Sequence, residues 1–264
     1  MLTKIFKLFC TCLIISVSLF SQTKNYFIVF IGNSITYGAG LKDPAANAPP
    51  VHAITWLQAK NNYGELHFSN QGVSGATTVD FLPATNKLFP RVIQGADLYK
   101  NQKDATLVFS VILGTNDSAI SGPNGAPVSP GSYGKNVKTI IDTLLNKYPG
   151  SRVILHRPIW YSPNTYNRSR YMDEGLNRLQ TYFPVLDKVV ESYQSSHPTR
   201  VFSGDTDAFE YFKKNAIVLF QKEKGNAGIF LLHPNEKGAQ ELGVFWAKGI
   251  EKCLQYLQAT KTPR

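Results

Sequence analysis

Four residues spread along the chain have the types needed for acyl-transfer chemistry: Ser34, Gly72, Asn116 and His233. A serine hydroxyl can attack a carbonyl carbon, and a histidine can take the proton that the serine gives up. Amide N–H groups can hold the oxyanion that then forms, and a glycine lets its backbone N–H approach a ligand closely because it has no Cβ. Taken singly, each residue sits in a segment that is also typical of an ordinary polar turn.

Apolar runs precede three of these segments and predict the strands that position them. A buried strand that stops at a glycine would hold Ser34 on the turn that follows, with its hydroxyl exposed. The expected strands are residues 25–31, 66–70, 105–113 and 152–155 and a short fifth strand at Val201. Helical spacing is seen over residues 51–61, 133–148, 177–194, with an interruption near Pro184, and 234–258.

Apolar strands that alternate with helices predict a mostly parallel sheet covered on both faces. We therefore expect a three-layer α/β/α sandwich with a flavodoxin-like five-stranded sheet. Ligands of such sheets bind beyond the carboxyl ends of the strands. Each of the first three expected strands ends in a polar, glycine-containing loop, so the candidate residues fall where this architecture would place a site.

In this order, the four residues resemble the Ser, Gly, Asn and His blocks of the SGNH (GDSL-like) hydrolase family. The resemblance spans residues 32–238. It implies that Ser34 is the nucleophile and that His233 is its general base. It also implies an oxyanion hole made by the backbone N–H groups of Ser34 and Gly72 and the side-chain amide of Asn116.

The sequence departs from the family pattern three residues before His233. The family has an aspartate there, which orients the imidazole, whereas this chain has Phe230. A phenylalanine cannot accept a hydrogen bond, so either a backbone carbonyl takes over this role or a carboxylate arrives from elsewhere. Asp205, Asp207 and Glu223 are the candidate carboxylates of the preceding segment. We expect a Ser-His dyad.

Residues 156–171 are rich in aromatic, amide and guanidinium groups, which suit a sugar better than a lipid chain. His156 ends the fourth expected strand and could line the rim of the site. The other expected substrate contacts are Arg157, Trp160 and Arg170. The alternative is that this stretch is an ordinary polar loop.

Residues 32–40, 113–118 and 158–164 are similar to bacterial carbohydrate O-acetylesterases, especially the sialate O-acetylesterases. This resemblance implies release of acetate from an O-acetylated glycan or sialic acid. A sialic carboxylate could pair with an arginine of the polar loop, namely Arg157, Arg168 or Arg170. Two alternatives stay open: a lipase- or thioesterase-type acylhydrolase of the same fold, and a non-catalytic glycan-binding pseudoenzyme.

The N-terminus has the pattern of a signal peptide. Residues 1–7 carry two lysines and no acid, and residues 8–20 form an apolar run. That run is shorter than the about 20 residues a membrane span needs, so no stable membrane anchor is expected. We predict a signal peptide over residues 1–21, a single hydrolase domain over residues 22–264, and a secreted or periplasmic protein.

The remaining composition excludes several classes of function. The 264 residues carry a formal net charge of +10, from 28 basic and 18 acidic side chains. These charges form no basic and aromatic stripe, so no nucleic-acid partner is expected. Neither a metal-ligand spacing nor a GxGxxG motif is present, so neither a metal nor a nucleotide cofactor is expected.

Overall fold

The computed structural model describes residues 24–259 except for residues 100 and 103. The predicted signal peptide, residues 1–21, therefore lies outside the described residues. A five-stranded sheet forms the centre, with every strand parallel to its neighbours and the order β2-β1-β3-β4-β5. Its strands are β1 (Asn25–Gly32), β2 (Leu66–Gly72), β3 (Ala105–Ile112), β4 (Arg152–Leu155) and β5 (Val201–Ser203).

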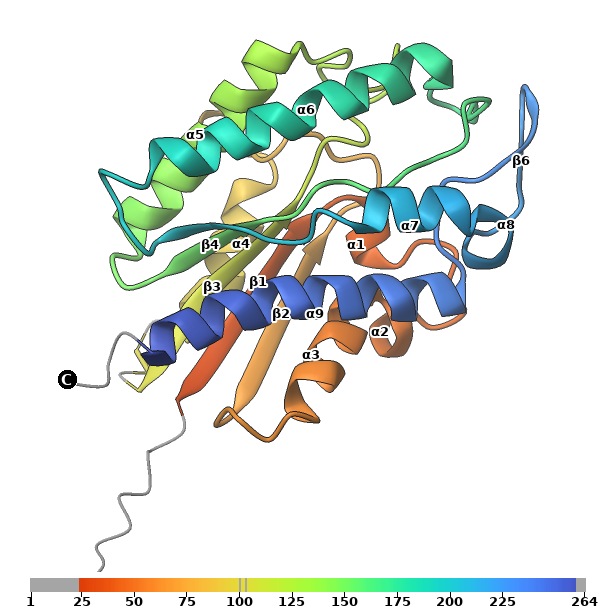
Figure 1. The fold of residues 1–264 in the computed structure, drawn as a ribbon. Helices are drawn as coiled ribbons and strands as arrows, with labels where there is room; N and C mark the ends of the chain where they lie inside the picture. The colour runs from red at the N-terminus through yellow and green to blue at the C-terminus, as the bar shows by residue number, and fades with distance from the viewer. Residues whose placement is uncertain (1–23, 100, 103, 260–264) are drawn as a thin grey trace, which may run out of the picture.

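Helices cover both faces of this sheet (Figure 1). One face is covered by α4 (Phe89–Asp97), α5 (Pro130–Lys147) and α6 (Met172–Ser192). The other is covered by α3 (Pro49–Gln58), α7 (Ala208–Lys214), α8 (Ala216–Leu219) and α9 (Glu236–Ala259). The short elements are α1 (Ser34–Tyr37), α2 (Pro44–Asn47), a 3-10 turn at Pro83–Thr85, and a separate hairpin of β6 (Glu223–Gly225) and β7 (Gly228–Phe230). The expected three-layer sandwich is thus confirmed, and the sheet is entirely parallel.

Strand β1, which lies between β2 and β3, shows why these residues form a strand covered on both sides. Phe27, Val29 and Ile31 pack in the cluster beneath α4, α5 and α6. Their neighbours Tyr26, Ile28 and Phe30 pack in the cluster beneath α3 and α9. Successive side chains of a strand point to opposite faces, so a continuous apolar run serves both cores. The carboxyl end of β1 then delivers the chain to Ser34.

The structure differs from the sequence-based expectation at one helix and at several short elements. Helix α6 continues through Pro184 instead of breaking there. The proline lies on the exposed side of the helix, where a carbonyl left without its N–H partner can bind water. Helices α4 and α7 and the hairpin of β6 and β7 were not predicted, because they are short or carry mixed polarity.

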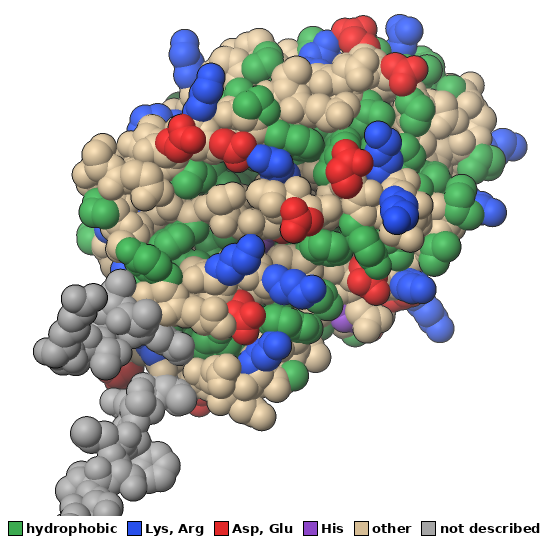
Figure 2. Space-filling view, in the orientation of Figure 1, with side chains coloured by type: hydrophobic (Ala, Val, Ile, Leu, Met, Phe, Trp, Pro, Cys, Tyr) green, Lys and Arg blue, Asp and Glu red, His purple; other side chains and the backbone are tan. Residues whose placement is uncertain are grey.

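Charges are dispersed over the face that Figure 2 shows, with lysine and arginine side chains scattered among acidic ones. This distribution suits a solubility role for much of the positive charge. Among the described residues, no helix combines the length and the apolar character needed to cross a membrane.

A buried carboxylate ties the loop after β2 to the loop after β3. Asp117 is fully buried, and its Oδ1 accepts hydrogen bonds from the backbone N–H of Thr78, at 2.9 Å, and from the Thr78 hydroxyl. Its Oδ2 has no hydrogen-bond partner among the described residues. Burial disfavours the charged form and raises the pKa of Asp117 to about 6, although the bonds from Thr78 oppose that change.

We predict that Asp117→Asn removes a pH-dependent loss of stability. In the unfolded chain an aspartate has a pKa of about 3.9, so between pH 4 and about 6 the folded protein binds more protons than the unfolded chain. The free energy of unfolding of the wild type therefore falls as the pH rises through this range. Relative to the wild type, the variant should gain on the order of 3 kcal/mol between pH 4 and pH 7.

Urea unfolding at several pH values between 4 and 7 measures this difference. The matched control is Asp173→Asn, at an exposed position in the first turn of α6. A stability difference between the Asp117 variant and the wild type that is the same at pH 4 and pH 7 would contradict the prediction.

Candidate active site

Ser34 begins a single helical turn directly beyond the carboxyl end of β1. Asn33 caps this turn, since its side-chain oxygen accepts a hydrogen bond from the backbone N–H of Ile35 at 3.0 Å. The N–H groups of the first turn of a helix have no partners within that helix, so the N–H of Ser34 can serve a ligand. The Ser34 residue is 9% exposed. The sequence thus folds a nucleophile-type serine onto a rigid, nearly buried turn.

His233 lies beside Ser34, although the two residues are 199 positions apart in the chain. Its Nε2 is 2.9 Å from Ser34 Oγ. The backbone around the histidine is fixed, because its carbonyl accepts from the N–H of Gln221 at 2.9 Å and Asn235 N–H donates to the carbonyl of Leu219 at 2.9 Å. The structure therefore brings the predicted nucleophile and base into hydrogen-bond contact.

A carboxylate completes this pair, so the predicted Ser-His dyad is wrong as a description of the geometry. Glu223 Oε2 lies 2.9 Å from His233 Nδ1, and Oε1 accepts from the backbone N–H of His233 at 3.0 Å. A carboxylate at Nδ1 requires the proton there, which leaves Nε2 free to accept the proton of Ser34. Of the three candidate carboxylates, Asp205 instead accepts from the backbone N–H groups of Asp207 and Ala208 at 3.0 and 3.2 Å.

The hairpin of β6 and β7 explains how the carboxylate replaces the usual aspartate. Glu223 on β6 pairs directly with Phe230 on β7, and Phe230 occupies the position three residues before His233. Residues paired across two strands have Cβ atoms about 4.5–5.5 Å apart. The family places its acid at the position of Phe230, on β7. In this chain the acid comes instead from the neighbouring strand β6, and the Phe230 ring is buried in the core.

The polar loop that suggested a sugar site holds this hairpin in place. Asn164 Nδ2 donates to the carbonyls of Ala227 and Ile229 at 3.2 and 2.7 Å. The backbone N–H of Ser162 donates to the carbonyl of Leu231, and Ser162 Oγ accepts from the N–H of Leu231, both at 2.8 Å. Part of the loop's amide and hydroxyl chemistry is therefore used inside the protein, to fix the strand that leads to the histidine.

Asn116 lies in the loop after β3 and is a buried polar residue, only 3% exposed. Its Nδ2 donates to the carbonyl of Ala76 at 2.8 Å, and its Oδ1 accepts from the hydroxyl of Tyr171 at 2.7 Å. A carboxamide nitrogen carries two hydrogens, so one N–H remains beyond the bond to Ala76. The side chain is thus held in one orientation with a donor to spare.

Gly72 does not have the role predicted for it. Its backbone N–H donates to Asn70 Oδ1 at 2.9 Å, so this donor is already used within the protein. A Cβ at Gly72 would lie 2.3 Å from the backbone nitrogen of Tyr37, which shows that glycine is needed there for close packing of β2 against α1. These contacts argue against the predicted oxyanion role for the N–H of Gly72.

Gly75 is the glycine of this loop that faces open space. Its φ of +79° is in the left-handed region, and a Cβ built there would meet nothing within 4 Å. The N–H of Ala76 closes the turn on the carbonyl of Val73 at 3.1 Å, so the turn itself does not use the N–H of Gly75. The next residue, Ala76, contacts Asn116, which puts Gly75 beside the predicted oxyanion donors.

His156 is a core residue and does not line the rim of the site. It is 1% exposed, with Nε2 3.0 Å from Ser110 Oγ and Nδ1 accepting from the backbone N–H of Asp205 at 3.0 Å. Its ring also packs against Trp246 of α9. Burial lowers the pKa of His156 to about 3, so the imidazole is neutral and structural.

The other predicted substrate contacts are dispersed. Arg157 pairs with Asp187 at 2.7 Å and lies over the ring of Phe183, so its charge is satisfied by α6. Trp160 is half-buried and packs edge-on against Phe220. Arg170 is exposed, and its described contacts are made by its backbone. The structure does not bring these three side chains together at Ser34.

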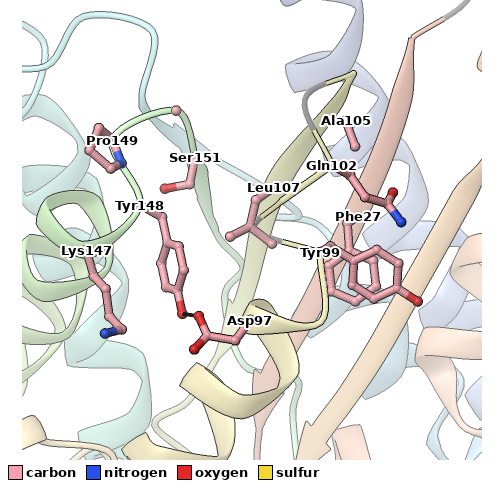
Figure 3. Close-up of a pocket in the computed structure, with 11 residues that line it drawn as sticks. Phe27, Asp97, Tyr99, Gln102, Ala105, Leu107, Lys147, Tyr148, Pro149 and Ser151 are labelled. Atoms are coloured by element: carbon pink, nitrogen blue, oxygen red, sulfur yellow. Dashed lines mark hydrogen bonds between the residues drawn. The ribbon is translucent and has the colours of Figure 1, made fainter.

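A separate cavity of about 330 Å³ lies at the opposite end of the sheet (Figure 3). Its lining combines the start of β1 and β3 with the ends of α4 and α5, including Phe27, Tyr99 and Tyr148. Phe27 is five residues before Gly32 on β1, or about 16 Å along a strand. The cavity is therefore not the site of Ser34. Within the described part of the chain, no group of three or more His, Cys, Asp or Glu side chains could hold a metal ion.

Comparisons with solved structures support the same fold. A lipase/acylhydrolase from Enterococcus faecalis is similar with a TM-score of 0.54 and 19% identity, over 86% of this chain and 96% of that one. A carbohydrate acetylesterase from Sinorhizobium meliloti is similar with a TM-score of 0.56 and 13% identity, over 86% of this chain and 99% of that one. An acetylxylan esterase from Geobacillus stearothermophilus is similar with a TM-score of 0.57 and 19% identity, over 86% of this chain and 95% of that one. At these identities the likeness shows the fold alone.

The comparison of sequences is more specific. A search among curated proteins found no match. The model of the GDSL-like Lipase/Acylhydrolase family matches residues 30–241, which run from the end of β1 and Ser34 through to His233 and the start of α9. The chain therefore belongs to the GDSL-like lipase/acylhydrolase family.

Proposed function

We propose that this protein is a serine esterase that removes O-acetyl groups from carbohydrate through an acyl-enzyme. The contact that carries the proposal is Ser34 Oγ to His233 Nε2 at 2.9 Å, with Glu223 on the far side of the imidazole. A serine hydroxyl is a weak nucleophile until a base takes its proton. This arrangement supplies the base, its correct tautomer and a negative charge to stabilise the imidazolium.

In the first half of the reaction, Ser34 Oγ attacks the acetyl carbonyl carbon while its proton passes to His233 Nε2. The carbonyl π electrons move to oxygen, which becomes the oxyanion. When the intermediate collapses, the bond to the sugar oxygen breaks and the imidazolium gives its proton to that oxygen. In the second half, water attacks the acetyl-serine through the same base, and acetate and free Ser34 are released.

Three groups support the oxyanion in this proposal. They are the backbone N–H of Ser34, the second N–H of the Asn116 amide, and the backbone N–H of Gly75 in place of that of Gly72. The open space in front of Gly75 and the contact of its neighbour Ala76 with Asn116 support this choice. Removal of one such donor typically costs about 2.7–4 kcal/mol of transition-state stabilisation.

An acetylated sugar is the substrate class that we propose, with sialic acid as the first candidate. The similar structures include a carbohydrate acetylesterase and an acetylxylan esterase, which supports the choice of an acetyl group and of a sugar. Tyr37, one turn after Ser34, is 49% exposed and offers an aromatic face. The exposed Arg168 and Arg170 favour an acidic sugar.

We predict that the wild type releases acetate from O-acetylated sialic acid and that Ser34→Ala and His233→Ala both abolish this release. The two variants remove the nucleophile and the base, while His197→Ala, at a half-buried position outside the site, should act like the wild type. Acetylated xylo-oligosaccharides, an aryl acetate and an aryl ester of a long-chain acid are assayed in parallel.

The pattern of activity separates the possible outcomes. Hydrolysis of an acetylated xylan or the aryl acetate, but not of the sialate, would keep the esterase and overturn the sialate proposal. A preference for the long-chain ester would indicate a lipase-type acylhydrolase. Sugar binding without hydrolysis of any ester would indicate a pseudoenzyme.

We predict that Glu223→Gln lowers kcat on the order of 10³-fold to 10⁴-fold with little change in KM, as loss of the acid of a catalytic triad does elsewhere. Glutamine can keep a hydrogen bond but cannot stabilise the imidazolium. The matched control is Glu236→Gln, a carboxylate three residues after His233 that contacts the backbone of Lys42. Wild-type kcat in the Glu223 variant would mean that Ser34 and His233 act as a dyad.

We also propose that residues 1–21 are a signal peptide and that the mature protein is secreted or periplasmic. The basic start and the apolar run of residues 8–20 support this. N-terminal sequencing of the protein recovered outside the cytoplasm should begin near residue 22. Recovery of the intact N-terminus from the cytoplasm alone would contradict it.

A further inference from the structure

The amide of Asn116 is held by two contacts that agree on its orientation. A backbone carbonyl only accepts hydrogen bonds, so the atom 2.8 Å from the Ala76 oxygen must be the amide nitrogen. The amide oxygen then faces Tyr171, whose hydroxyl is 2.7 Å away and must donate. A flip of the amide would place its oxygen against the Ala76 carbonyl and its nitrogen against the tyrosine, and would lose the contact with Ala76.

Tyr171 is itself fixed and remains a donor. It is 3% exposed, and burial raises the pKa of its hydroxyl well above the usual value. Its backbone N–H donates to the carbonyl of Thr165 at 3.1 Å, and its carbonyl accepts from the N–H of Gly175 at 2.8 Å. Its ring packs edge-on against Tyr161. Because backbone and ring are both held, the hydroxyl has little freedom to leave Asn116.

Met172, the residue after Tyr171, has an unusual backbone conformation. Met172 has a φ of +54°, a region that non-glycine residues rarely adopt. Its N–H also contacts the carbonyl of Thr165, at 3.3 Å, so the loop from Thr165 is closed just where the chain enters α6. The residue before Tyr171 is tied to the loop after β3, because the carbonyl of Arg170 accepts from the backbone N–H groups of Ile120 and Ser121 at 2.6 and 3.3 Å.

We infer that Tyr171 is a positioning residue for the proposed reaction, which sets the Asn116 amide so that its N–H, and not its oxygen, faces the developing oxyanion. The inference rests on the proposed esterase function. Without the hydroxyl, the amide keeps only the bond to Ala76 and can rotate. An amide oxygen turned toward the oxyanion would repel the charge that the N–H is meant to stabilise.

The test is the kinetics of aryl acetate hydrolysis by Tyr171→Phe. This change removes one oxygen atom and keeps the ring packing. We expect kcat to fall about tenfold with KM unchanged, which is less than the about 10²–10³-fold loss typical when a donor is removed entirely. In an Asn116→Ala background, the same change at Tyr171 should alter kcat less than about twofold, because there is no amide left to orient.

The matched control is Tyr161→Phe. Tyr161 belongs to the same buried cluster, contacts the Tyr171 ring and bonds through its hydroxyl to Ser118 Oγ at 2.9 Å, not to Asn116. The substitution Tyr161→Phe removes a buried tyrosine hydroxyl from the same loop region, and kcat should stay within about twofold of the wild type. Urea unfolding of both variants shows whether they lose similar stability.

Three results would overturn the inference: wild-type kcat in Tyr171→Phe, an equal loss of kcat with and without the Asn116 side chain, or an equal loss in Tyr161→Phe. The last two would mean that the hydroxyl acts through general packing of the loop. Failure of the proposed function looks different, because the wild type and Ser34→Ala would then hydrolyse the ester at the same background rate.

Discussion

A carboxylate that binds both N–H groups of one histidine fixes that residue's backbone and its ring together. Glu223 makes this double contact with His233, and the position of Nε2 relative to Ser34 depends on it. A hairpin with only three residues in each strand has too few contacts to hold the glutamate in place by itself. The hairpin is therefore secured by the loop that contains Ser162 and Asn164, whose side chains bind the backbone of β7 and the residues around it.

The parallel sheet positions the residues on the other side of His233, namely Ser34 and the loops next to it. Because β1, β2 and β3 are neighbours and run in the same direction, the loops that follow them meet at one edge. Ser34, the turn at Gly75 and Asn116 thus come together although they are far apart in sequence. Asp117 and Thr78 join two of these loops, so the same buried carboxyl group whose ionisation costs stability between pH 4 and about 6 also holds the loops of Gly75 and Asn116 together.

Much of the fold could be predicted from the sequence, because β1, β3 and β4 are short, mostly apolar runs with clear ends. Ser34 and Asn116 could be found as candidates in the same way, from polar residues that follow such ends, whereas His233 is identified through the resemblance of the four segments to the SGNH hydrolase family. Glu223 could be named only as one of three candidate carboxylates, because it lies between Lys222 and Lys224 and looks like part of a solvated surface. Alternation places the glutamate on the opposite side of β6 from both lysines. A signal for the hairpin was present in Gly225 and Gly228, which flank a two-residue turn.

The remaining errors have a common physical origin: residue type shows what chemistry a side chain can do, but not which partner it meets. His156 and Arg157 follow β4 at the correct edge of the sheet, yet one binds Ser110 in the core and the other binds Asp187 on α6. Gly72 has a glycine's freedom, yet it serves close packing, whereas Gly75 three residues later faces open space. Tyr171, which looked like part of a sugar platform, instead bonds to Asn116. The loop from Ser162 to Tyr171 therefore contacts both the strand that leads to His233 and the side chain of Asn116, so in the proposed reaction its packing would position the base and an oxyanion donor together.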